Sequence, residues 1–355
     1  MSNHLSNKIE TNAIYKPIPK KSGGYCLPEH KLASISYIRL IAMFFIIICH
    51  FLQYYDNELA WWFNVGVQIF FIISGFLCGG KEINDPIAFI VRQFKKILIP
   101  YYTFLIPVSI VYMFFARKSI TITSFIKSVF GVGTIKGLEH LWFVGYILFC
   151  YILTPYLFWI KKKLENVSLM KMTVVFLSCL GFSVIFSTLF HSYFDASRVC
   201  CYIVGYFMAV YYSRYRDSAI KVFTIIFSVI AVPVNLVRIY LKYIYTIPEN
   251  SIFEKLFHFS EGYMHLALGA MVFLILFILL RRARPCMLTE QSDRHSYYIY
   301  VVHQLFILSP FTLMAITPFK ALNWLIVCVC IIIAEFIVYI LSGIIMKTFI
   351  IGEHK

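Results

Sequence analysis

The sequence predicts an all-α integral membrane protein, a bundle of about ten transmembrane helices with both termini cytoplasmic. Only 14% of the 355 residues are charged and 60% are hydrophobic, whereas a soluble domain carries roughly 25% charged residues. The mean hydropathy is +0.78, and apolar stretches long enough to cross a hydrocarbon core of about 30 Å follow one another along the chain. Because these stretches lack the alternating polarity of barrel strands, we expect helices.

The predicted spans form one membrane domain with a short tail at each end. Residues 1–33 are polar and basic, with three prolines and a Gly-Gly pair, and are predicted to be a mobile cytoplasmic tail. Residues 34–346 make up the transmembrane domain, and residues 347–355 a cytoplasmic C-terminal tail. The ten spans are 36–51, 61–77, 97–115, 141–160, 172–190, 198–212, 221–240, 258–280, 297–316 and 323–345.

The distribution of basic residues orients the predicted bundle. With the N-terminus inside, most of the 32 lysine and arginine residues fall in cytoplasmic segments, as is typical of multi-pass proteins. The net charge of +15 therefore has a membrane explanation. We expect the lipid bilayer to be a partner of this chain and nucleic acid not to be one.

Cysteines and metal-ligand residues indicate no metal centre. The ten cysteines include no C-x-x-C pair, so neither a disulfide framework nor a zinc ribbon is predicted. His258, Glu261 and His265 share one helix face and form a possible metal site, but no fourth ligand is evident. Polar residues near the membrane surface explain them better, and we expect no metal.

Two ionisable residues within the first predicted span are candidates for function, because charge inside a membrane is costly. Arg39 and His50 are eleven residues apart, which returns both side chains to within about 20° of one helix face, roughly 16 Å apart along the axis. A cation near one end of the span and a titratable base toward the other end would suit a long anionic substrate. The alternative is a snorkelling arginine and an interfacial histidine without chemistry.

Four further motifs follow in a fixed order. They are FF-x-x-SGF at 70–76, a basic run from Arg92 through Lys96 to Pro100, HLWF at 140–143, and S-x-x-x-Y-x-x-H at 296–303. With Arg39 and His50, this series resembles the acyltransferase-3 family over residues 34–345. The resemblance implies a ten-helix enzyme of the plasma (bacterial inner) membrane that O-acetylates a surface or exported carbohydrate. The acceptor would be either a lipid-linked precursor or the finished polymer. Cytoplasmic acyl-CoA, most simply acetyl-CoA, would be the co-substrate, and no cofactor would be bound.

The resemblance also implies roles for individual residues. Arg39 and His50 would form the family's catalytic pair, and Arg39, Arg92 and Lys96 would hold the phosphates of the acyl-CoA by charge-assisted hydrogen bonds. Lys96 stands where an arginine is more usual, and lysine lacks the bidentate fork that grips a phosphate. His50 would act as general base on a sugar hydroxyl or would itself be acylated, and the sequence leaves both routes open.

Other polar residues in the spans have two interpretations each. Ser74 and Gly75 do not form a nucleophile elbow, and close helix packing is the better account. His140 and Trp142 are predicted at the external end of the fourth span, where they would contact the acceptor glycan or serve as an interfacial anchor. His303 would touch the donor or bond a neighbouring helix. Glu335 is expected to be either protonated or paired with a basic residue such as His303.

Two other functions compete with acyl transfer. A transporter or flippase that moves a glycan or lipid without chemistry would also place polar residues around a membrane cavity. A sensor or assembly factor could keep the fold without activity. Arg39 and His50 argue against this, because a site that had lost its activity would have no reason to keep polar groups that are energetically costly in a membrane. Transfer of labelled acyl groups distinguishes an enzyme from both.

Overall fold

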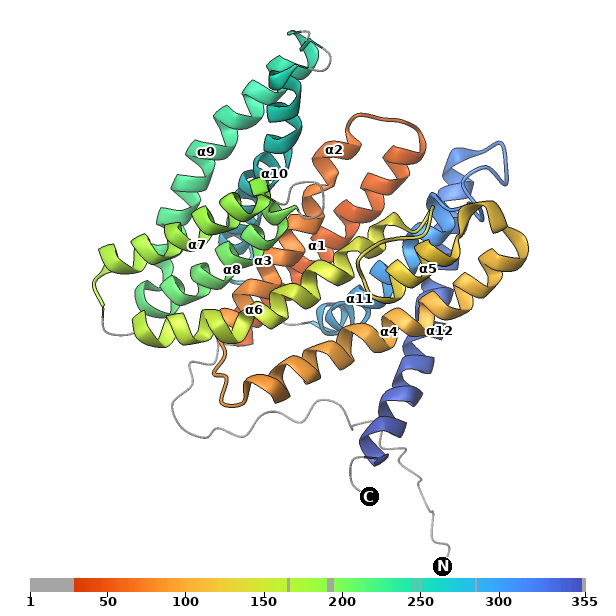
Figure 1. Cartoon of the computed structure of the whole chain (residues 1–355), viewed down its shortest axis with the longest axis horizontal. Helices are drawn as coiled ribbons and strands as arrows, with labels where there is room; N and C mark the ends of the chain where they lie inside the picture. Colours follow the sequence, from red (N-terminus) through yellow and green to blue (C-terminus); the bar gives the residue numbers. More distant parts are fainter. Residues whose placement is uncertain are drawn as a thin grey trace, which may run out of the picture.

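The computed structural model describes residues 29–164, 167–189, 195–245, 247–248, 251–284 and 286–352. All regular structure in these segments is helical (Figure 1). The elements are α1 (Glu29–Tyr54), α2 (Ala60–Phe63), α3 (Val65–Gly79), α4 (Pro86–Phe115), η1 (Arg117–Ser119), α5 (Ile122–Val129), η2 (Glu139–Leu141), α6 (Trp142–Leu164), α7 (Leu169–Leu189), α8 (Ala196–Tyr215), α9 (Asp217–Tyr243), α10 (Ile252–Leu279), α11 (Met287–Ile307) and α12 (Lys320–Gly352).

Eight helical stretches of the described chain are long and apolar enough to cross a membrane. The prediction of an all-helical, multi-pass membrane protein is therefore confirmed, whereas the count of ten and the cytoplasmic termini stay predictions. The eight stretches are Ala33–Tyr54, Ala60–Gly79, Pro86–Phe115, Glu139–Leu164, Leu169–Phe186, Asp217–Tyr243, Ile252–Leu279 and Lys320–Thr348.

The predicted spans 198–212 and 297–316 are not among these eight, for different physical reasons. They correspond to α8 and α11. Neighbouring helices bury almost every side chain of α8 up to Tyr212, so this helix has no broad face that must be apolar toward lipid. The first half of α11 carries the charged residues Asp293 and Arg294, which lower its hydropathy.

Glycine brings α3 and α8 into close contact at the centre of the bundle. A Cβ atom on Gly75 would lie 2.0 Å from the carbonyl oxygen of Tyr202, and one on Gly205 would lie 2.1 Å from that of Ile72. No side chain fits at either position, which agrees with the packing role predicted for Gly75. The outer helices show the opposite pattern, with apolar side chains exposed along α9 and α12, as lipid contact requires.

The ninth predicted span is wrong in its limits. α11 begins at Met287 and ends at Ile307, well before residue 316. Pro310 has no backbone N–H to continue a helix, and the backbone N–H of Phe311 donates to Ser309 Oγ at 2.9 Å, which forms a turn. This earlier ending moves His303 from the first half of a span to the last part of a helix.

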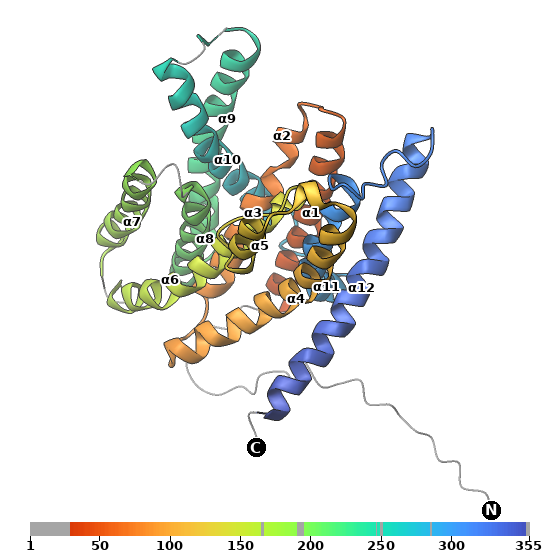
Figure 2. The same ribbon diagram turned by 45° about the vertical axis from the view of Figure 1, so that its right-hand side comes forward.

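The remaining differences concern the ends of the chain and the second span. α1 begins at Glu29 and α12 ends at Gly352, so helix extends into both stretches predicted as tails; residues 1–28 and 353–355 lie outside the described segments. The second predicted span is two helices, α2 and α3, joined at Asn64. Figures 1 and 2 show α9 and α10 rising as a hairpin beyond the bundle, on the side where α2 lies.

Candidate active site

The Arg39 and His50 side chains both lie where α1 packs against α11, a contact that we call the α1–α11 seam. Arg39 meets Asp293 of α11, and His50 meets His303 of the same helix. The two helices therefore run in the same direction. Eleven residues separate the two positions on α1 and ten separate them on α11, which correspond to about 16 and 15 Å at 1.5 Å per residue.

The Arg39 end of the seam is a closed network of polar bonds. Arg39 Nη1 lies 2.5 Å from Asp293 Oδ1, and the Ser36 hydroxyl donates to Asp293 Oδ2 at 2.5 Å. The arginine side chain is 18% exposed and the aspartate 37%. Both carboxylate oxygens thus bind α1, so this carboxylate fixes α1 against α11 while it neutralises the Arg39 charge.

The other end of the seam gathers three histidines from three elements, which we call the histidine cluster. The ring centroids of His50 and His303 are 5.0 Å apart, and those of His140 and His303 are 4.8 Å apart. His140 and His303 are buried, with 4% and 0% of their surface exposed. The early ending of α11 explains why His303 lies beside His50 and not at the opposite end of the seam.

Hydrogen bonds fix one ring nitrogen of each histidine. Nδ1 of His50 bonds Gln53 Oε1 at 2.6 Å, Nε2 of His140 bonds the Val301 carbonyl at 3.0 Å, and Nδ1 of His303 bonds the Tyr300 carbonyl at 2.6 Å. Because these oxygens accept, the bonded nitrogen carries the proton in the neutral ring and the second nitrogen keeps a lone pair. Within the described chain, His140 Nδ1 and His303 Nε2 are buried and have no hydrogen-bond partner.

A second layer of bonds holds η2 against α11. Gln304 Oε1 accepts from the backbone N–H of His140 at 3.0 Å, and Gln304 Nε2 donates to Glu139 Oε2 at 3.1 Å. The Tyr300 hydroxyl donates to the His140 carbonyl oxygen. Side chains of α11 thereby position the His140 backbone on both sides, which keeps the cluster rigid.

Tyrosines connect the two ends of the seam. Tyr297 and Tyr300 follow Asp293 on one broad face of α11, with ring centroids 6.4 Å apart and planes at 13°. The Tyr297 hydroxyl donates to the Ile97 carbonyl of α4 at 3.0 Å. Tyr151 of α6 lies within electrostatic range of both Arg39 and Tyr297. An aromatic, hydroxyl-bearing face thus runs from the arginine to the histidine cluster.

The basic run at the start of α4 belongs to a group of cations. Lys96 is within electrostatic range of Arg92 and of Lys81, which follows α3. These three cations form one group, and the anion to which Arg39 is bound is the Asp293 carboxylate. The structure thus brings Arg92 and Lys96 together, whereas Arg39 is bound to Asp293.

Trp142 lies under a cation and not on an open surface. The Arg198 guanidinium carbon is 3.4 Å from the centroid of the Trp142 ring, and Arg198 Nε binds Asp195 Oδ2 at 2.9 Å. Trp142 and His140 are close in sequence but have different surroundings, because His140 belongs to the histidine cluster.

Other polar residues singled out from the sequence have the following surroundings. Glu335 has a basic partner, but the partner is His295, with Nδ1 2.5 Å from Oε1, and not His303. His265 Nε2 bonds the Trp61 carbonyl at 2.9 Å, and no group of histidine, cysteine or acidic side chains in the described segments could hold a metal ion. The cysteines of these segments form no disulfides.

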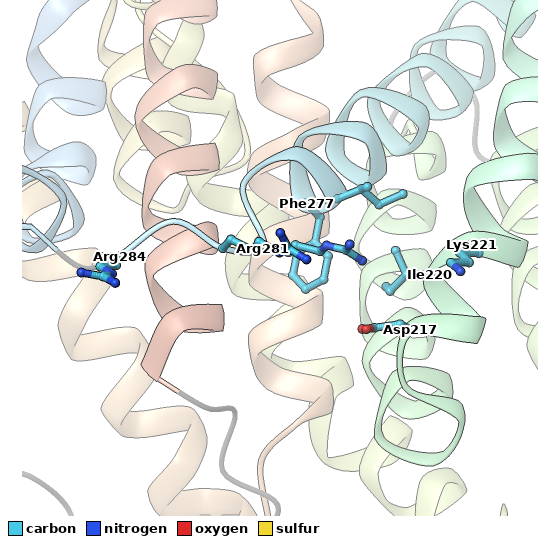
Figure 3. A pocket seen from close by; sticks show the side chains of 8 residues that line it. Asp217, Ile220, Lys221, Phe277, Arg281 and Arg284 are labelled. Atoms are coloured by element: carbon cyan, nitrogen blue, oxygen red, sulfur yellow. The ribbon is translucent and has the colours of Figure 1, made fainter.

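A basic cavity of 620 Å³ opens at the Arg39 side of the bundle, between the start of α9 and the end of α10. Figure 3 shows Lys221 and Asp217 on one side of it and Arg281 and Phe277 on the other. The segment that lines it adjoins the start of α1, because Ser34 Oγ donates to the Leu280 carbonyl at 2.8 Å.

Sequence reasoning missed Asp293 and Gln304 as site residues. Asp293 precedes the S-x-x-x-Y-x-x-H motif by three residues and lies ten residues before His303, nearly the Arg39–His50 spacing. This matched spacing was available in the sequence. The pairing of α1 with α11 was not, because it depends on how distant helices pack.

The family comparison agrees with these observations. A family model described as an acyltransferase domain, that of the acyltransferase-3 family, matches residues 32–343. Searches of curated proteins and of solved structures found no significant match. The family match covers nearly the whole helical bundle and includes the α1–α11 seam with both of its polar ends. The chain therefore belongs to the acyltransferase-3 family and is a multi-pass membrane acyltransferase.

Proposed function

We propose that this protein is an O-acetyltransferase of the plasma membrane, which moves an acetyl group from cytoplasmic acetyl-CoA to a hydroxyl of a cell-surface or exported carbohydrate. The histidine cluster carries this proposal. It offers three ring nitrogens with lone pairs, two of them buried without a partner in the described chain, at the far end of a seam that begins with Arg39. Such a group of bases suits the removal of a hydroxyl proton.

The donor would enter at the Arg39 side. Arg92 and Lys96 provide cations for the CoA phosphates, and the cavity with Arg281 and Lys221 adds positive charge near the start of α1. Arg39 is bound to Asp293, so its contribution would be either a hydrogen bond from its remaining N–H groups or the fixing of α1. The pantetheine arm would follow the tyrosine face toward the cluster.

The reaction would take place at His50. Nε2 of His50 accepts the proton of the acceptor hydroxyl, the hydroxyl oxygen bonds the acetyl carbonyl carbon, and the thioester C–S bond breaks. The proton then passes to the departing CoA thiolate, so the products are the ester and the CoA thiol. In the second route, His50 Nε2 bonds the acetyl carbonyl carbon, the thioester C–S bond breaks and the CoA thiolate leaves. The acceptor hydroxyl then attacks the acetyl-imidazolium, its C–N bond breaks to release neutral His50, and the hydroxyl proton passes to the thiolate.

The acceptor would approach from the opposite side of the bundle. His140 Nδ1 and His303 Nε2 can each accept a hydrogen bond from a sugar hydroxyl. Trp142 would contribute through the Arg198 that covers its ring, because the guanidinium edge can still donate to sugar oxygens.

The test is transfer of radiolabelled acetyl from acetyl-CoA into glycan, in membranes with wild-type protein or His50→Ala at matched expression. We expect label with the wild type and none above background with the variant. Equal label in both would refute the role of His50. Movement of unmodified glycan across the membrane, with no label in either sample, would favour a flippase.

A further inference from the structure

A second cavity, of 510 Å³, lies at the outer end of the α9–α10 hairpin beside α2. We call it the hairpin cavity. Residues from all three helices line it, and no part of the proposed reaction uses it. Its polar and aromatic lining residues are Trp61, Arg238, Lys242, Tyr243, Tyr245, Glu254, Phe257, His258 and Glu261.

Arg238 is the most unusual of these residues because its side chain is only 1% exposed. Its guanidinium carbon lies 3.4 Å from the centroid of the Trp61 ring, and His265 stacks on Trp61 with centroids 3.8 Å apart. Nη2 of Arg238 reaches Glu261 Oε1 at 3.4 Å, which is a long contact. This stack holds the guanidinium plane in one orientation at the cavity wall.

Most of the hydrogen-bonding capacity of Arg238 is unused. Nε and Nη1 are buried and have no partner within the segments that the structure describes. Stacking on Trp61 does not satisfy them, because guanidinium N–H groups point along the plane and not toward the ring. A buried donor without an acceptor is destabilising, so these atoms indicate a ligand that supplies oxygen acceptors.

The charges around the cavity favour an uncharged ligand. Glu254 and Glu261 line it, and Glu58 adjoins it through an ion pair with Lys242 at 3.5 Å. These three carboxylates face two permanent cations, Arg238 and Lys242. A phosphate or carboxylate ligand would be repelled by the carboxylates, whereas sugar hydroxyls can donate to carboxylates and accept from a guanidinium at the same time.

Polar side chains continue from this cavity toward the histidine cluster. His265, under Trp61, lies within electrostatic range of Arg198 and Asp195. Arg198 covers Trp142 and is also within range of Tyr300, whose hydroxyl donates to the His140 carbonyl. The hairpin cavity and the cluster thus form the two ends of one polar path.

We propose that the hairpin cavity binds an uncharged sugar residue of the acceptor glycan, at a distance from the hydroxyl that is acetylated. This inference rests on the carbohydrate acceptor of the proposed function. Arg238 donates to ring or hydroxyl oxygens, Glu254 and Glu261 accept from hydroxyls, and the half-exposed rings of Tyr243 and Tyr245 offer faces for the sugar.

The test measures glycan binding directly, with the full-length protein in nanodiscs. The probes are uncharged trisaccharides of glucose, galactose, mannose and N-acetylglucosamine, with trigalacturonate as the acidic comparison. We expect saturable binding of at least one uncharged probe, weakened at least tenfold in Arg238→Gln and severalfold in Glu254→Ala, a partly exposed position. Lys255→Ala, an exposed neighbour on α10 outside the cavity lining, is the matched control and binds as wild type.

Other outcomes would overturn the proposal. They are binding of trigalacturonate alone, no saturable binding of any uncharged probe, or equal binding by wild type and both cavity variants that elute as folded protein. His50→Ala separates this inference from the proposed function. That variant should lose acetyl transfer and keep the sugar binding that depends on Arg238. If the wild type binds sugar through Arg238 but transfers no acetyl, the proposed function fails and the sugar site stands. If Arg238→Gln transfers acetyl with an unchanged acceptor KM, the sugar site is excluded and the proposed function stands.

Discussion

The two ends of the α1–α11 seam differ in how completely their polar groups are satisfied. At the Arg39 end, both oxygens of Asp293 accept bonds from α1. At the other end, His140 and His303 each keep a buried nitrogen that bonds nothing in the described chain. Buried polar atoms without partners are rare in native proteins and need an explanation. The comparison indicates that one end fixes the helices and the other end performs chemistry.

The sharpest test of this comparison is His50→Ala. Removal of a general base or nucleophile should lower kcat by about 10²–10⁴-fold. The variant should insert and elute as wild type, because His50 bonds only Gln53 of its own helix among the described residues. Acetyl transfer by purified protein measures the effect, and a loss below tenfold would contradict the assignment.

A second test is His303→Gln. The glutamine keeps hydrogen-bonding atoms but not the imidazole geometry, so we expect kcat to fall about ten- to a hundredfold, the effect of one hydrogen bond of about 1.5–3 kcal/mol. His295→Gln is the matched control, because His295 is on the same helix but pairs with Glu335. Equal losses in the two variants would show that α11 responds to any substitution and that the cluster is not special.

Asp293→Asn tests the paired end. Loss of the charge should cost about 1–3 kcal/mol of stability, since hydrogen bonds to charged groups contribute that much. If the Arg39 end only fixes the helices, Tm falls and the KM for acetyl-CoA changes little. If Arg39 also binds donor phosphate, the KM changes, and Arg39→Ala raises it further. An unchanged Tm would show that the pair does not fix α1.

The smallest expected effect belongs to Lys96→Arg. Arginine can grip a phosphate with two N–H groups, and one added hydrogen bond of about 0.5–1.5 kcal/mol lowers KM about two- to tenfold. kcat should not change, because Lys96 is grouped with Lys81 and Arg92 and not with the histidines. Steady-state kinetics with varied acetyl-CoA measures this, with Lys95→Arg as the control; a changed kcat at constant KM would exclude a donor-binding role.

Local patterns were sufficient for much of the fold. Helices α4, α7, α9 and α12 were predicted because each is continuously apolar and faces outwards. The helix predicted at 198–212 is present as α8, but it is not one of the eight stretches apolar enough to cross a membrane, and the limits of α11 were predicted less well. A helix surrounded by other helices needs no apolar face toward lipid, and the end of α11 depends on the turn around Pro310.

The sequence by itself determined the membrane class, the family, and the shared helix face of Arg39 and His50, because hydropathy, ordered motifs and helical periodicity are local properties. Only the tertiary structure decided that Asp293 binds Arg39, that His140 and His303 join His50, and that Arg238 lines a cavity without enough acceptors. Each of these contacts joins helices that are far apart in the chain. Their pairing follows from the packing of whole helices, to which glycines such as Gly75 contribute by allowing close approach.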